Sequence, residues 1–223
     1  MPQLDLTGPA GRLEALLEEP AGARFAAVVC HPHPHPRYGG TMHNHATYRL
    51  ARAVRAAGGT TLRFNYRGVG RSAGRYDDGR GERDDTRAAV AALHAHAPGL
   101  PLVVAGFSFG AWMAIHMGGS EPAPRALLLA GLPLRSADLD GARDPGLVRA
   151  LPQPVAVVQA ERDTFGAPAE VEAALAGSRG PRRVVAVAGA SHLFTEELAG
   201  LERAAGQGLA WLLDAAGLAG GAA

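Results

Sequence analysis

The sequence predicts an α/β fold in which helices cover both faces of a mostly parallel sheet. Short apolar runs alternate with helix-like stretches along the chain, which is the pattern of such a sheet. One run, 102–107, is continuously apolar, as expected for a strand that is buried on both faces. The 223 residues fit one domain. We therefore expect a single domain over residues 1–216 and a flexible tail over residues 217–223.

The first two expected strands, 3–7 and 12–18, form an antiparallel hairpin. A Gly-Pro-Ala-Gly turn joins them, and such a turn between two strand-like runs is typical of a hairpin. The other strands are expected at 25–31, 60–66, 102–107, 125–130, 155–160 and 183–188.

Helix-like stretches follow most of these strands and stop at glycine or proline. The helix expected at 45–57 stops at Gly58-Gly59, and the helix expected at 82–97 stops at Pro98-Gly99. The other helices are expected at 111–117, 169–176 and 195–215. Residues 132–154 leave room for a short helix or a loop and not for a cap domain, so we expect an open cleft without a lid.

Composition and charge exclude several classes of partner. The net charge is +1, and acidic residues are interleaved with the basic ones, so we expect no nucleic-acid partner. No apolar run is long enough to span a membrane, and no signal peptide precedes the first strand, so we expect a cytoplasmic protein without a membrane partner. Cys30, the sole cysteine, allows no internal disulfide. We expect a monomer or a homodimer.

The segment Gly106-Phe107-Ser108-Phe109-Gly110 has the G-x-S-x-G spacing of a nucleophile elbow. It stands between a buried strand and a helix, which is the context that this motif requires. Glycine is needed on both sides of the serine because side chains there would collide in so tight a turn. We therefore predict Ser108 as a nucleophile.

The base and acid should follow the nucleophile along the chain, with the acid first. Only His116 and His192 come after Ser108, and His116 lies inside the helix that the elbow starts. His192 follows the last strand, where a loop reaches the same edge of the sheet as Ser108, so we predict it as the general base. Asp163, just after the strand 155–160, is predicted to orient the imidazole.

Other carboxylates remain alternatives for the acid. Glu161 is closer to the end of the strand and is expected to point elsewhere. The acid can also follow the preceding strand, 125–130, which leaves Asp138, Asp140 and Asp144 open.

The oxyanion of an acyl-transfer reaction needs two backbone N–H donors. One is expected from Phe109, at the start of the helix after the elbow. The other should come from the loop after the strand 25–31, where Pro32, Pro34 and Pro36 have no N–H to donate. His33 is nearest to the expected position, so we predict its amide as the second donor.

Five histidines gather between positions 31 and 45, at His31, His33, His35, His43 and His45. Their spacing does not favour a metal site, because residues two apart in an extended proline-rich segment point in different directions. No recognised set of zinc ligands is present. We expect structural roles for these histidines, no metal and no cofactor.

Several motifs together resemble the small bacterial α/β hydrolases related to dienelactone hydrolase and short-chain esterases. The match runs from about residue 3 to residue 215 and includes His-Pro-His-Pro from position 31, Gly-Gly-Thr-Met from position 39 and Phe-Asn-Tyr-Arg-Gly-Val-Gly-Arg-Ser from position 64. The resemblance implies an α/β-hydrolase fold with an eight-stranded sheet and a triad of Ser108, Asp163 and His192. True dienelactone hydrolases differ, since they use cysteine where this chain has Ser108.

These features predict a serine hydrolase of small ester or thioester substrates that works through an acyl-enzyme. Tyr38 and Leu134 are expected among the apolar walls of its cleft, whereas Phe107 and Trp112 are expected in the core. Two alternatives remain open: a small peptidase or amidase with the same triad, and a catalytically silent hydrolase fold that binds a ligand or partner.

Overall fold

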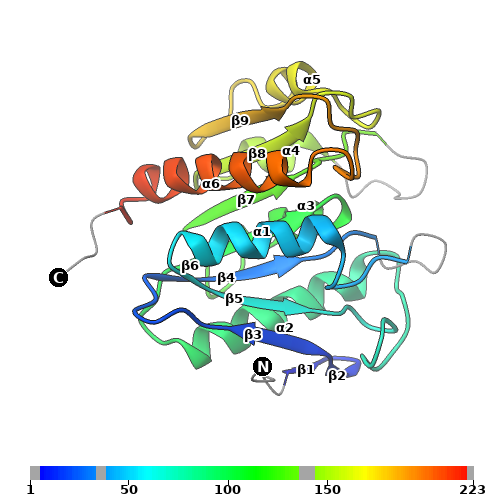
Figure 1. Ribbon diagram of the computed structural model, residues 1–223. Helices are drawn as coiled ribbons and strands as arrows, with labels where there is room; N and C mark the ends of the chain where they lie inside the picture. The colour runs from blue at the N-terminus through cyan, green and yellow to red at the C-terminus, as the bar shows by residue number, and fades with distance from the viewer. Residues whose placement is uncertain (1–5, 34–38, 136–143, 220–223) are drawn as a thin grey trace.

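The computed structural model describes residues 6–33, 39–135 and 144–219. Seven strands form one sheet in the order β3-β5-β4-β6-β7-β8-β9, and all neighbours are parallel except β3 and β5 (Figure 1). The strands are β3 (Ala15–Glu18), β4 (Phe25–Cys30), β5 (Gly59–Phe64), β6 (Leu102–Phe107), β7 (Ala126–Ala130), β8 (Val155–Ala160) and β9 (Arg182–Val187). The predicted fold class is confirmed.

The predicted number of strands in the sheet is wrong. The expected hairpin forms between β1 (Leu6–Gly8) and β2 (Gly11–Leu13), but these two strands make a separate sheet. The second expected strand is divided at Glu14, whose backbone N–H donates to Ser72 Oγ and whose carbonyl accepts from Asn65 N. Only the part after Glu14, β3, joins the main sheet, which therefore has seven strands instead of eight.

Among the described residues, two helices cover one face of the sheet and four cover the other. Side chains of α1 (His45–Ala56) and α6 (Leu198–Ala215) share one buried core with alternate residues of the central strands. The second core receives side chains from the remaining helices, which are α2 (Arg80–His96), α3 (Phe109–His116), α4 (Pro145–Ala150) and α5 (Pro168–Ala174). Figure 1 shows α1 and α6 side by side on the near face.

Alternation along β6 explains why this strand reads as one apolar run. Val103, Ala105 and Phe107 belong to the core under α1 and α6. Leu102 and Val104 belong to the core on the opposite face. Both faces are buried, so neither set of alternating positions can be polar.

Several loops meet at the carboxyl edge of the parallel strands. The segments after β4, β6, β7, β8 and β9 leave the sheet at this edge. In the described part of residues 132–154, the chain forms α4 and no cap domain. None of the helices among the described residues has the length and apolar character needed to cross a membrane.

Candidate active site

Ser108 lies in a strained turn between β6 and α3. Its backbone has φ 55° and ψ −115°, a conformation that residues with a side chain adopt at a cost of about 1–3 kcal/mol. A Cβ on Gly106 would collide with the carbonyl of Gly110, and a Cβ on Gly110 would lie 2.5 Å from the carbonyl oxygen of Cys30. The two glycines are thus required by backbone packing, as the sequence motif predicts.

The three side chains predicted as a triad come together at this edge of the sheet. Ser108 Oγ lies 2.9 Å from His192 Nε2, and His192 Nδ1 lies 2.8 Å from Asp163 Oδ2. A carboxylate can only accept, so Nδ1 carries the imidazole proton and Nε2 is the acceptor for the serine hydroxyl. This protonation is the one that a general base for Ser108 needs.

Asp163 is held by two further donors that the sequence analysis did not identify. Gln159 Nε2 donates to Asp163 Oδ2 over 3.0 Å, and the amide of Phe165 donates to Asp163 Oδ1 over 2.9 Å. Gln159 is fully buried and also binds the backbone at Leu132 and Gly166. The only sequence signal for its role is one polar residue near the end of the apolar run of β8.

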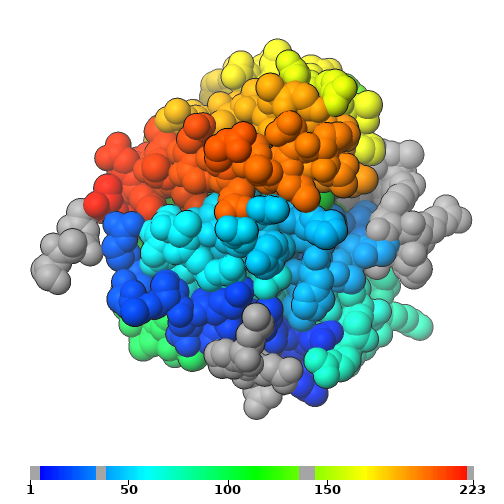
Figure 2. All heavy atoms as spheres, in the orientation of Figure 1, coloured from blue at the N-terminus to red at the C-terminus, as the bar shows by residue number. Residues whose placement is uncertain are grey.

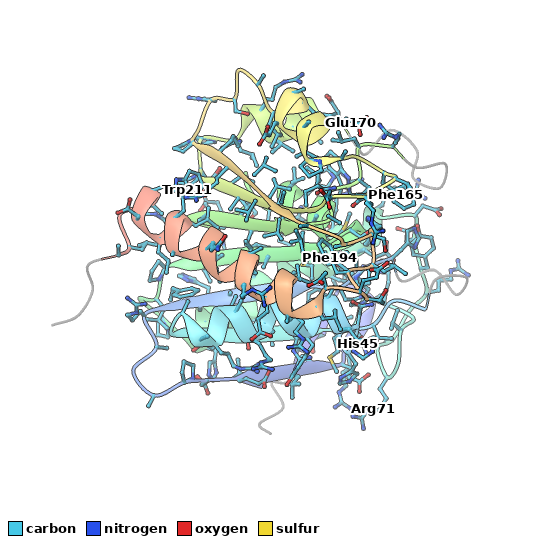
Figure 3. The ribbon with its side chains drawn as sticks, turned by 45° about the horizontal axis from the view of Figure 1, so that its top comes forward. His45, Arg71, Phe165, Glu170, Phe194 and Trp211 are labelled. Carbon is cyan, nitrogen blue, oxygen red and sulfur yellow. The ribbon has the colours of Figure 1, made fainter. Side chains whose placement is uncertain are left out.

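Two aromatic rings flank the imidazole of His192. The Phe165 ring meets it edge-on with 4.6 Å between centroids, and the Phe107 ring lies on another side at 5.5 Å. Phe107 is fully buried, whereas Phe165 is only half-buried in the loop after β8 (Figure 3). The rings restrict the rotation of His192 and leave Phe165 as an apolar surface beside it. Sequence analysis did not single out Phe165.

Three of the alternative residues for the acid and the base do not reach the site. Glu161 is exposed and accepts a hydrogen bond from Gly189 N. Asp144 caps α4 by accepting from Gly146 N, and His116 lies at the far end of α3. Asp138 and Asp140 fall outside the described residues.

The predicted oxyanion donors lie on neighbouring segments. Phe109 is the first residue of α3, so its amide has no acceptor within the helix. A Cβ on Gly110 would strike the carbonyls of Cys30 and His31, which shows how closely the elbow packs against the end of β4. The His33 ring contacts the Phe109 ring at 4.9 Å, and its Nε2 lies 3.3 Å from the hydroxyl of Tyr76.

The structure describes one of the two predicted substrate-binding residues. Leu134 is half-buried, and its amide donates to the carbonyl of Phe165, so it packs against the loop that carries Asp163. A Cβ on Gly166 would lie 3.1 Å from its side chain. Tyr38 lies outside the described residues.

Other predicted features concern metals and the cysteine. Across residues 6–33, 39–135 and 144–219, no group of three or more His, Cys, Asp and Glu side chains is arranged to hold a metal ion. Cys30 is fully buried, and burial raises the pKa of its thiol to about 12, so the thiolate that a nucleophile requires does not form near neutral pH.

A groove of about 500 Å³ lies elsewhere on the molecule, between α1 and α6. Arg49, Arg52 and Glu202 stand on it, and none of the three triad side chains lines it. In Figure 2 the two helices form adjacent bands across the near face.

A family model described as an alpha/beta hydrolase domain matches residues 37–205. The chain belongs to the α/β-hydrolase family. The match includes the elbow and the loops that carry Asp163 and His192.

Solved structures of similar proteins extend the comparison to nearly the whole chain. An alpha-beta serine hydrolase homologue from Coxiella burnetii is 31% identical, with a TM-score of 0.81 over 93% of this chain and 97% of that one. A serine hydrolase without a lid from Xanthomonas campestris is 33% identical, with a TM-score of 0.79 over 95% of this chain and 94% of that one.

An uncharacterized protein of Rickettsia prowazekii is 40% identical over 118 residues, which is 52% of this chain and 49% of the relative. The chain thus spans about half the length of this curated relative. The α/β-hydrolase family assignment rests on the family model and on the solved structures.

Proposed function

We propose that this hydrolase cleaves small ester or thioester substrates through an acyl-enzyme on Ser108. The observation that carries the proposal is the continuous chain of hydrogen bonds from Ser108 Oγ through His192 to the buried Asp163. The strained conformation at Ser108 adds support, since such strain gathers at functional sites.

Acylation starts when Ser108 Oγ attacks the substrate carbonyl and its proton passes to His192 Nε2. Asp163 stabilises the imidazolium that forms and stays ionised. The amides of Phe109 and His33 donate to the oxyanion of the tetrahedral intermediate. When this intermediate collapses, His192 gives its proton to the leaving alcohol or thiol, and the acyl group remains on Ser108.

In deacylation the same steps occur again, with water as the nucleophile. His192 removes a proton from the water as it attacks the acyl carbonyl, and the second intermediate releases the acid. His192 returns the proton to Ser108 Oγ, so the enzyme regains its starting state.

The absence of a cap domain from the described residues favours small substrates. Phe165 and Leu134 offer apolar surface beside the acid loop, but nothing described encloses a long acyl chain. We expect esters and thioesters with acyl groups of a few carbons to react faster than long-chain lipids. The partner is then a small molecule, and the protein works as a monomer or a homodimer.

A fluorophosphonate probe and a substrate panel test the proposal. Wild type should be labelled on Ser108 and should hydrolyse short p-nitrophenyl esters or acyl thioesters faster than amino-acid amides. Ser108→Ala should abolish labelling and reduce hydrolysis by several orders of magnitude. Ser178→Ala is the matched control, because the Ser178 hydroxyl donates to the carbonyl of Leu175 and makes no hydrogen bond to the triad among the residues that the structure describes.

Faster cleavage of amides would indicate a peptidase or amidase. An unlabelled wild type with no hydrolysis would support a silent fold and contradict the proposal.

A further inference from the structure

We propose that His31 is a positioning residue that fixes the peptide between Pro32 and His33 and so aims the His33 amide at the oxyanion. His31 follows β4 directly, is fully buried and touches none of the triad side chains through a described hydrogen bond. The inference rests on the proposed function, because it concerns the second oxyanion donor of that reaction.

Both ring nitrogens of His31 are bound to backbone. The amide of Tyr66 donates to Nε2 over 3.2 Å, and Nδ1 lies 2.7 Å from the carbonyl oxygen of Pro32. A backbone N–H can only donate, so Nε2 must be the unprotonated nitrogen. Nδ1 then carries the proton and donates it to Pro32.

This bond orients the N–H of His33 as well as the carbonyl of Pro32, because both belong to one planar peptide. The only cis peptide among the described residues joins Glu121 and Pro122, so the peptide at Pro32 is trans. In a trans peptide the N–H points away from the C=O. A carbonyl held against the buried His31 ring therefore turns the His33 N–H away from that ring.

Gly40 also constrains the backbone at Pro32 and His33. Its amide donates to the carbonyl of His33 over 3.1 Å. A Cβ on Gly40 would lie 2.5 Å from the carbonyl oxygen of Pro32 and would also strike the carbonyl of His33. The peptide is thus held between the His31 ring and the Gly40 backbone, as a preorganised donor requires.

The His31 ring keeps a single proton near neutral pH. Burial lowers its pKa to about 3, so the ring stays neutral near neutral pH. The Tyr66 ring packs against it with 4.4 Å between centroids, which restricts rotation about the side chain.

Two conservative variants separate the two bonds of His31. In His31→Asn the amide nitrogen can occupy the place of Nδ1 and donate to Pro32. In His31→Gln the amide oxygen can occupy the place of Nε2 and accept from Tyr66. We expect His31→Asn to keep kcat on p-nitrophenyl acetate within a few-fold of wild type. His31→Gln should lose about 100-fold in kcat with little change in KM. The rate of fluorophosphonate labelling should fall in parallel with kcat.

Controls distinguish positioning from a merely structural role. Melting temperatures of both variants are measured alongside His116→Asn, a change at a histidine outside the site. Gly40→Ala gives a second route, because it displaces the same peptide from the other side and leaves His31 intact; it should also slow labelling.

Equal loss of kcat in His31→Asn and His31→Gln, tracking their melting temperatures, would overturn the role of His31. Unchanged labelling in the His31 variants and in Gly40→Ala would do the same. A wild type that the probe does not label contradicts the proposed function itself.

Discussion

Asp163 has no exposed side-chain surface and still accepts hydrogen bonds from three groups. One comes from His192, one from Gln159 and one from the backbone of Phe165. A buried carboxylate is stable only when it is hydrogen-bonded and paired in this way. These bonds hold the carboxylate in a fixed orientation with Oδ2 against His192, and water has no access to it.

Asp163→Asn should lower kcat/KM by about 10,000-fold, because an amide at this place favours the wrong imidazole tautomer. Glu161→Gln, two residues away, is the matched control and should stay within about twofold. Steady-state kinetics on a short ester, with circular dichroism to check folding, measure both. A large loss in Glu161→Gln together with an active Asp163→Asn would show that Glu161 is the acid.

Sequence reasoning identified the candidate residues that chain order singles out. Ser108 has its own motif, and His192 is the only histidine after it outside α3. Gln159 and Phe165 have no such signal. Their contacts with Asp163 and His192 depend on the path of the loop after β8, which local sequence does not determine.

At the level of elements, the turn from β6 into α3 combines a strained serine with two close backbone approaches. The helix begins at Phe109, two residues earlier than the sequence predicts, because Ser108 itself takes the N-cap position. The strain at Ser108 is held by packing around Gly106 and Gly110 and by the bond from Ser108 N to the carbonyl of Ala130.

Gly110→Ala should destabilise the protein by about 1–3 kcal/mol and reduce labelling of Ser108, since its Cβ would overlap the Cys30 carbonyl. Gly206→Ala is the matched change in α6, where nothing lies within 4 Å of the added Cβ. It should stabilise the protein by about 0.4–1 kcal/mol. Urea unfolding measures both variants, and a stable, fully reactive Gly110→Ala would contradict this account of the elbow.

The division of the chain at Glu14 shows what periodicity leaves open. The sequence predicts one strand over residues 12–18, where the structure has β2 and β3 on either side of Glu14, because a strand-like pattern carries no information about which strand each half pairs with. β2 pairs with β1 and β3 pairs with β5, and the change of partner coincides with the bonds from Glu14 to the loop at 65–72.

Over the whole molecule, the alternation of strands and helices was sufficient to predict the three layers. A strand that is apolar on both faces needs helices packed on both sides of the sheet. Burial between these layers also keeps two histidines uncharged near neutral pH. His31 is the fully buried residue that follows β4, and the half-buried His116 lies at the end of α3 on the face covered by α2 to α5. Both have lowered pKa values, and burial is the main cause in each case.

These histidines should make the free energy of unfolding fall as the pH falls. The pKa of His116 is lowered from 6.5 to about 4 in the folded protein, so the unfolded chain binds more protons between these values. Protonation therefore favours unfolding in this window and has no effect above it. His116→Leu should flatten the slope between pH 6.5 and 4 by no more than about 1 kcal/mol per pH unit.

Urea unfolding at several pH values measures this slope. Ser178→Ala, which changes no titratable group, is the control and should leave the slope unchanged. His116→Leu also removes a buried Nε2 that has no hydrogen-bond partner among the described residues, so at pH 7.5 it should not destabilise the protein. Parallel curves for wild type and His116→Leu would show that His116 titrates alike in both states.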